Sequence, residues 1–180
     1  MPEHPACRAA VASAAARIQA LRQRSETRAS SPSLDHGGRT VTDLHRGLGL
    51  LMIEVCGISR SAPELRRGLQ RVADLRAEFE ADLRLPDHGA GPDEALERAL
   101  RLDDFLGLAD LMLRDALARE ESCGAHFREE HQTAAGEALR DDERFAHIAA
   151  WEHRPGQEPL RHQEPLSYSA ITPKIGRAHV

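Results

Sequence analysis

Apolar residues recur at helical spacing in four separate segments of this chain, and this pattern allows few folds. The longest segment runs from about Asp93 to Glu120. Side chains three and four residues apart share one face of a helix, so this segment is predicted to be the central helix of a bundle. Its apolar face is predicted to consist of Leu96, Leu100, Phe105, Leu108, Leu111 and Met112.

Three shorter segments carry the same period and complete the predicted bundle. They cover about residues 7–26, 40–57 and 61–83. Their apolar faces are predicted from Val11, Ala15, Ile18 and Leu21, from Leu44, Leu48, Leu51, Met52 and Val55, and from Leu65, Leu69, Val72, Leu75 and Phe79. Aliphatic residues must supply the core, because aromatic residues make up only 3% of the chain.

Two of these helices have recognisable first residues. Thr40 and Asp43 form a capping-box pattern, in which each side chain accepts a backbone N–H at the start of the helix. Ser61 and Glu64 repeat the pattern, and Gly57 is predicted to end the second helix. The stretches at about residues 28–38 and 84–92 are rich in glycine, proline and serine and are predicted to be linkers.

The periodicity changes beyond Arg140. Residues 145–153 and 165–171 flank turn residues at 154–157, which predicts two short strands. The predicted fold class is therefore mainly α, a three- to four-helix bundle followed by an extended tail with a short β-hairpin. We divide the chain into an N-terminal helix and linker (1–39), the helical bundle (40–140) and the extended tail (141–174).

Composition and missing motifs exclude several function classes. The net charge is −5, and aromatic and basic residues do not interleave, so we expect no nucleic-acid partner. No apolar run approaches the roughly 20 residues that cross a bilayer, so direct membrane insertion is not expected. Three widely spaced cysteines do not make a disulfide framework. No G-x-G-x-x-G follows a predicted strand, so the chain cannot build a standard dinucleotide fold by itself.

Residues 120–145 hold the densest group of reactive side chains. Cys123, His126 and His131, with Glu129 or Glu130 as a fourth ligand, are residue types that zinc accepts. Structural zinc sites usually contain a second pair of ligands, and nothing else in the sequence supplies one. A nucleophile–base pair of Cys123 with a histidine is a second alternative, for which the sequence identifies no orienting group.

Two further polar groups are predicted to lie at the surface. His45 and Arg46 are typical of a solvated or partner-facing patch on the second helix. A solvated turn or helix cap is the usual structure for Arg140, Asp141, Asp142 and Glu143. The planar guanidinium of arginine also favours fixed pairing with a carboxylate across an interface.

Four segments, taken in order, resemble the C-terminal helical domain of the succinate dehydrogenase/fumarate reductase flavoprotein subunit. They are residues 41–49, 54–60, 116–130 and 139–143. The family signature E-S-R-G-A-H, then R, then D-D-E is matched by Glu121, Ser122, Gly124, Ala125, His126, Arg128, Asp141, Asp142 and Glu143. Cys123 stands where arginine is commoner. The form E-S-C-G-x-H, with the later A-x-W-E around Trp151, resembles one bacterial branch of the succinate dehydrogenase flavoproteins, and the resemblance covers about residues 40–173.

This resemblance implies a supporting role. A flavoprotein of this family holds FAD covalently, oxidises succinate to fumarate and passes electrons to an iron–sulfur subunit and then to quinone. Its flavin-binding and substrate-capping domains lie upstream, so no catalytic, FAD-binding or metal-binding residue is carried over to this chain. The chain alone is expected to contain no FAD and to be inactive, and FAD is expected in the parent subunit.

The resemblance also implies partners and a location. The partners are the upstream flavin-binding domain and the iron–sulfur subunit of the complex. The implied location is cytoplasmic, at the inner face of the bacterial membrane through partner subunits. Residues that carry the signature or the interface are expected among His45, Arg46, Glu121, Ser122, Cys123, Gly124, His126, Arg128, Arg140, Asp141, Asp142 and Glu143.

Further expectations concern the two ends of the chain and its identity. Residues 175–180 coincide with one reading frame of a common sequencing adapter, so we expect them to be an artefact. The chain is expected to be a fragment, with Met1 an internal or misassigned start. The alternatives are a stand-alone helical interaction module, or the same domain of a fumarate reductase or an L-aspartate oxidase.

Overall fold

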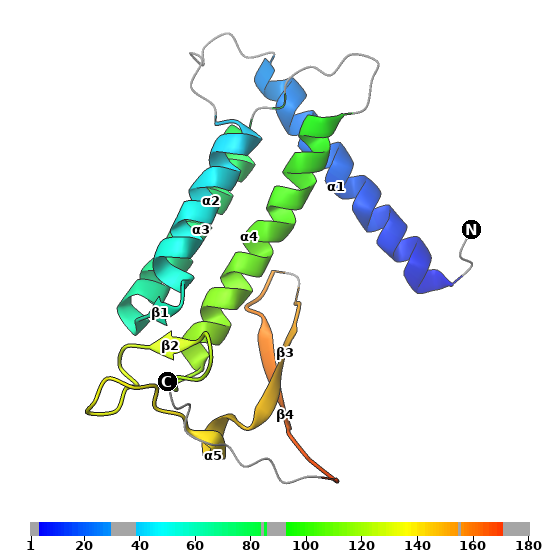
Figure 1. Cartoon of the computed structure of the whole chain (residues 1–180). Coiled ribbons are helices and arrows are strands. Elements are labelled where there is room, and N and C mark those ends of the chain that lie inside the picture. The colour runs from blue at the N-terminus through cyan, green and yellow to red at the C-terminus, as the bar shows by residue number, and fades with distance from the viewer. Residues whose placement is uncertain (1–3, 30–38, 84, 86–92, 155, 171–180) are drawn as a thin grey trace.

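The computed structural model describes residues 4–29, 39–83, 85, 93–154 and 156–170 of the chain. Four long helices make up most of this part, and one short helix and two pairs of strands complete it (Figure 1). In chain order the elements are α1 (Pro5–Ala29), α2 (Val41–Cys56), β1 (Ser59–Arg60), α3 (Ala62–Asp82), α4 (Glu94–Ala118), β2 (Phe127–Arg128), α5 (Asp142–Phe145), β3 (His147–Glu152) and β4 (Leu160–Pro165). The predicted fold class is confirmed.

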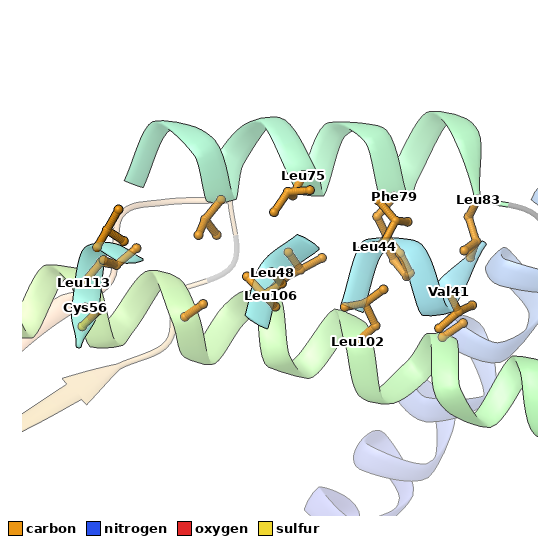
Figure 2. Packing of buried hydrophobic residues seen from close by; sticks show 14 of the residues in the cluster. Val41, Leu44, Leu48, Cys56, Leu75, Phe79, Leu83, Leu102, Leu106 and Leu113 are labelled. Carbon is orange, nitrogen blue, oxygen red and sulfur yellow. The ribbon is translucent and has the colours of Figure 1, made fainter. Parts of the chain in front are cut away.

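Helices α2, α3 and α4 pack together and enclose the core (Figure 1). Helix α4 also contacts α1, so the prediction that it is the central helix is confirmed. Figure 2 shows labelled side chains of all three helices meeting between the ribbons. The buried residues include Leu44, Leu48 and Val55 of α2, Leu65, Val72, Leu75 and Phe79 of α3, and Leu102, Leu106 and Leu113 of α4.

The predicted helix starts are confirmed by their hydrogen bonds. The backbone N–H of Asp43 donates to Thr40 Oγ1 at 3.1 Å, and the Thr40 N–H donates to Asp43 Oδ2 at 3.2 Å. The Glu64 N–H donates to Ser61 Oγ at 3.4 Å at the start of α3. Each cap satisfies backbone donors that a helix leaves unpaired at its first turn.

The apolar face that was predicted for α4 is only partly the buried one. Leu96 is buried, whereas Phe105, Leu108 and Met112 are 42%, 54% and 46% exposed. The buried side of α4 consists of Leu96, Ala99, Leu102, Leu106, Ala109, Leu113 and Ala116. The prediction was wrong for the three exposed residues because apolar side chains surround much of this helix, and its small alanines lie on the side where α2 and α3 pack.

Helix α1 lies away from the core over most of its length (Figure 1). Val11 is 60% exposed, so the apolar face that was predicted for this helix is wrong at that residue, whereas Leu21 is 5% exposed and packs on the core. Arg17 joins the helix to α4 through ion pairs with Asp103 and Asp104, each at 2.8 Å. Leu21, the partly buried Ile18 and the two ion pairs of Arg17 therefore contribute to its attachment.

A parallel strand pair ties the α2–α3 connection to the loop that follows α4. In this pair Ser59 of β1 lies opposite Phe127 of β2, and Arg60 lies opposite Arg128. The Phe127 N–H donates to the Ile58 carbonyl at 3.0 Å. The sequence did not predict this pair, because two residues are too few to show a strand periodicity.

The hairpin forms as predicted on its first strand only. Strand β3 lies within the predicted segment 145–153, whereas β4 spans Leu160–Pro165 and shares only Pro165 with the predicted segment 165–171. The prediction followed apolar residues, but β4 is mostly polar and is held by its backbone pairing with β3 and by charge. Arg161 Nε lies 3.7 Å from Asp115 Oδ1 of α4, and Trp151 Nε1 of β3 donates to the same oxygen at 3.0 Å.

Several predictions concern residues outside the described part of the chain. They are most of the two linkers (30–38, 84 and 86–92), Pro155 of the predicted turn, the start at Met1 and residues 171–180. Within the described residues, no helix combines the length and apolar character needed to span a bilayer.

Candidate functional site: a polar network at the end of α4

The loop that follows α4, residues 119–131, folds back over the end of that helix, and we call it the signature loop. Its Arg128 side chain is 3% exposed. One guanidinium nitrogen, Nη1, donates to the carbonyl oxygens of Ala116, Leu117 and Arg119 at 2.9, 3.2 and 3.3 Å. The last carbonyls of a helix have no partner within it. Arg128 therefore caps the carboxyl end of α4.

Electrostatics favour this cap, because the carboxyl end of a helix carries partial negative charge. Helix α4 has no basic residue in its last turn, so Arg128 supplies the positive charge from the loop. Its Nε donates to Glu130 Oε2 at 3.2 Å, and Glu130 Oε1 accepts the Ala62 N–H at the start of α3. Although burial opposes it, these hydrogen bonds lower the pKa of the Glu130 carboxyl. The end of α4 is thereby joined to the start of α3.

Ser122 holds the signature loop in shape. Its side chain is fully buried, and its Oγ accepts the Arg128 backbone N–H at 2.8 Å while donating to the Arg128 carbonyl at 3.1 Å. A hydroxyl can fill both roles because it is a donor and an acceptor. Ser122 therefore fixes the backbone of the residue whose side chain caps α4.

Glu121 links the signature loop to the segment before α5. Its side chain is 2% exposed and pairs with the Arg119 guanidinium. The Asp141 backbone N–H donates to Glu121 Oε2 at 2.9 Å, while Arg140 Nη2 pairs with Asp142 Oδ1 at 2.7 Å. The two halves of the sequence signature, E-S-C-G-A-H and D-D-E, therefore meet in space through this buried carboxylate.

His126 lies between two arginines, and its hydrogen bonds define its tautomer. Nδ1 lies 2.9 Å from Arg60 Nη1, and Nε2 lies 2.9 Å from the Arg119 carbonyl oxygen. A guanidinium only donates and a carbonyl only accepts, so Nδ1 must accept and Nε2 must carry the hydrogen. Burial lowers the pKa of His126, and the charges of Arg60, Arg119 and Arg128 lower it further, against the opposing hydrogen bond to the Arg119 carbonyl.

We therefore expect acid to destabilise the fold through His126. A lowered folded pKa means that the unfolded chain binds the proton more tightly. The stabilisation from neutral His126 is complete above the unfolded pKa of about 6.5 and is lost as pH falls below it toward the folded value. The urea midpoint should decrease from about pH 7 to about pH 5, and His126→Gln should show a smaller decrease. An equal decrease in both proteins would exclude His126 as the responsible group.

The structure gives no support to the metal and nucleophile alternatives. His126 uses both ring nitrogens within the network, and Cys123 meets it only through two backbone hydrogen bonds of 2.8 and 3.1 Å. Within the residues that the structure describes, no three His, Cys, Asp or Glu side chains are placed to hold a metal ion. Gly124 occupies the tip of the loop with a φ of 59°, a conformation that glycine adopts without strain.

The remaining predicted residues lie elsewhere, at the other end of the bundle (Figure 1). His45 and Arg46 are exposed on the first turns of α2. The His45 ring lies against Phe105 of α4, with 5.5 Å between ring centroids. Both rings line a cleft of about 310 Å³ together with Val41, Thr42, Arg98 and Arg101.

Sequence reasoning missed three contributors to the network. Arg60 and Arg119 hold His126, and Asp115 anchors the hairpin. No local signal identifies Arg60, because its contact partner lies 66 residues away in the chain. A second cleft, of about 420 Å³, opens beside this network and is lined by Cys56, Arg60, Leu108, Leu111, Met112, Asp115, Ala116, Arg119, His126, Ala149 and Trp151.

The described residues do not form a site that fits FAD. Dinucleotide cofactors bind at the carboxyl ends of parallel strands that lead into a glycine-rich turn and a helix. The parallel pairing within the described part is limited to two residues on each strand, and the turn after β1 reads Ser61, Ala62 and Pro63. No step of flavin chemistry is therefore assigned to these residues.

Comparison with known proteins shows which family and which relatives the chain resembles. Residues 45–177 match the family described as fumarate reductase flavoprotein C-term. The fumarate reductase flavoprotein subunit of Escherichia coli K12 is 30% identical over 129 residues, which are 71% of this chain and 21% of that protein. The succinate dehydrogenase flavoprotein subunit of Rickettsia bellii is 30% identical over 95 residues, which are 53% of this chain and 16% of that protein.

Solved structures show the same fold. A structure of E. coli quinol fumarate reductase superposes with a TM-score of 0.73 at 24% identity, and the match covers 96% of this chain and 27% of that one. The chain spans about a fifth of the length of curated relatives that it matches, at 21% and 23% of two of them. The similarity therefore concerns one domain of a larger protein.

Proposed function

Because this chain belongs to the family of fumarate reductase flavoprotein C-terminal domains, we propose that it is the packing domain of a flavoprotein that interconverts succinate and fumarate. In this proposal the domain supplies surfaces for the flavin-binding body of the same subunit and for an iron–sulfur subunit. The covalent FAD and the groups that contact the dicarboxylate belong to the body, which lies outside this chain. The parent complex would lie at the inner face of the bacterial membrane.

One observation carries this proposal: the buried polar side chains of the sequence signature form their hydrogen bonds within the domain. Glu121, Ser122, His126 and Arg128 are buried, and each forms hydrogen bonds with the end of α4 or with a neighbouring loop. A catalytic group must reach a substrate within hydrogen-bonding distance. Buried groups that cap α4 and join loops support a structural role.

We further propose that the parent enzyme oxidises succinate in the cell. The support is the E-S-C-G form of the signature around Cys123, which resembles a succinate dehydrogenase branch. The measurement that assigns the direction is the ratio of succinate oxidation to fumarate reduction by the intact flavoprotein complex. A complex that reduces fumarate much faster than it oxidises succinate would contradict this assignment.

The packing role predicts binding without chemistry. The purified chain is expected to lack flavin absorbance after incubation with FAD and to show no succinate-dependent dye reduction. It is expected to bind the flavin-binding body of the E. coli fumarate reductase flavoprotein, expressed without its own C-terminal region and purified with its FAD retained. Size-exclusion chromatography and calorimetry measure this binding. A folded chain that ignores the FAD-retaining body would contradict the proposal.

A further inference from the structure

An exposed stripe along α4 repeats with the spacing that packs against another helix. The residues Arg98, Arg101, Phe105, Leu108 and Met112 follow one another at intervals of three, four, three and four. Alternating intervals of three and four place side chains along one line of a helix and form the seam of a coiled coil. The three apolar members are between 42% and 54% exposed in this chain. This line is distinct from the side of α4 that faces the core.

Helix α2 forms the other wall of this surface. His45 of α2 contacts Phe105 of α4, so the two helices meet beside the stripe. One turn further along α2 lies Gly49, where an added Cβ would meet no atom within 4 Å. Ile53, the next residue on this side, is 75% exposed. We call Gly49 and Ile53 of α2 with Phe105, Leu108 and Met112 of α4 the α2–α4 face. These residues are apolar and exposed, and Gly49 adds no side chain.

Clefts and charge mark both ends of the α2–α4 face. The cleft of about 310 Å³ lies at the end where Phe105 meets Arg98 and Arg101. The cleft of about 420 Å³ lies at the other end, where Leu108 and Met112 meet the signature loop. The side chains of Arg98 and Arg101 remain 64% and 67% exposed although each pairs with a glutamate of its own helix. A partner at that end meets two accessible guanidinium groups.

We propose that the α2–α4 face receives an α-helix from the flavin-binding body of the same subunit, an inference that rests on the proposed function. The matching helix presents apolar side chains at alternating intervals of three and four, places a small residue or its backbone over Gly49, and ends with a carboxylate beside Arg98 and Arg101. Glycine inside a helix is less favourable than alanine. Close approach of a second helix backbone explains why glycine stands at position 49, because no contact within the described part of this chain requires glycine there.

The length of the relatives favours the same polypeptide over a separate subunit. Contacts between domains of one chain resemble transient interfaces between separate proteins, so the two parts can be tested as separate chains. About four fifths of the length of the relatives lies outside this chain, since the match covers 21% of the E. coli relative.

Charge substitutions test the α2–α4 face without removing any core contact. Gly49→Glu and Leu108→Glu place a carboxylate in the apolar region, and Ala73→Glu makes the same kind of change at an exposed position of α3 outside it. Each variant is titrated with the FAD-retaining body of the E. coli flavoprotein described above, and its fold is checked by urea denaturation. We expect Gly49→Glu and Leu108→Glu to weaken binding about tenfold or more, while Ala73→Glu binds like the parent chain.

A gentler variant separates docking from stability. Gly49→Ala adds a Cβ into open space, so it should raise the urea midpoint of the chain while weakening its binding to the body. If the parent chain does not bind the body, the proposed function fails and this inference fails with it. If the parent chain binds and all four variants bind equally, the packing role stands and the α2–α4 face is not the surface that is used.

Discussion

Replacing Arg128 with alanine is expected to lower the free energy of unfolding by about 2–4 kcal/mol, the cost of leaving buried carbonyl groups at the end of α4 without their charged donor. The side chain is 3% exposed, and its Nη1 serves three carbonyl oxygens at the end of α4. Without it the Ala116 and Leu117 carbonyls lose this donor, whereas the Arg119 carbonyl keeps His126 Nε2 and the Glu130 carboxylate keeps the Ala62 N–H. Urea denaturation followed by circular dichroism measures the loss.

Two variants control this experiment. Arg128→Lys keeps the positive charge but cannot reproduce the planar fork of the guanidinium, so it should retain part of the stability and remain measurable if the alanine variant does not fold. Arg71→Ala removes an arginine that is 61% exposed on α3 and should change stability by no more than about 0.5 kcal/mol. A cost below about 1 kcal/mol for Arg128→Ala would contradict the capping role.

Replacing Leu113 with alanine is expected to cost about 2–5 kcal/mol, because it opens a cavity in a closely packed core. Leu113 is fully buried in α4. Its two terminal carbons lie 3.0 and 3.3 Å from the point where a Cβ on Gly68 would stand, and Val55 Cγ2 lies 2.7 Å from the same point. The three helices therefore approach one another closely around Gly68 of α3, and the surroundings have little room to collapse.

Leu108→Ala is the matched control for this prediction. The change is the same, the helix is the same, and the side chain is 54% exposed. It should cost less than about 1 kcal/mol in the isolated chain, because little apolar area is removed from contact. Equal losses at both positions, measured by urea denaturation, would show that the two sides of α4 are equally buried in solution.

The contrast between Leu113 and Leu108 also explains the error in the predicted face of α4. Both residues fit a helical period. Nothing in the sequence indicates which of two apolar stripes on one helix faces the core. The core side was selected by packing, since Ala99, Ala109 and Ala116 allow the backbones of neighbouring helices to approach. The other stripe was left exposed, and it became the surface that we assign to a partner helix.

The second strand of the hairpin was misplaced for a related reason. Strand β4 is mostly polar, so apolar alternation could not locate it. Its position depends on pairing with β3 and on the contact of Arg161 with Asp115, a residue of α4. Contacts of this kind lie between segments that are far apart in the chain, and local propensity does not report them.

The sequence by itself determined the features that depend on the local order of residues. The apolar period set the four helices. The Thr40–Asp43 pair set the start of α2, the Ser61 hydroxyl set the start of α3, and the ordered signature identified the family. The helices and their starts depend on residues a few positions apart, and the signature depends only on the order of residues along the chain.

Only the tertiary structure decided what the signature does. Arg128 caps α4, Glu121 joins the two halves of the signature, and His126 bonds Arg60 across 66 residues of sequence. Those roles depend on where the chain returns in space, because a hydrogen bond needs its partner within about 3 Å and sequence distance does not set that separation. The residues that identify the family therefore also cap α4 and join the loops at its end.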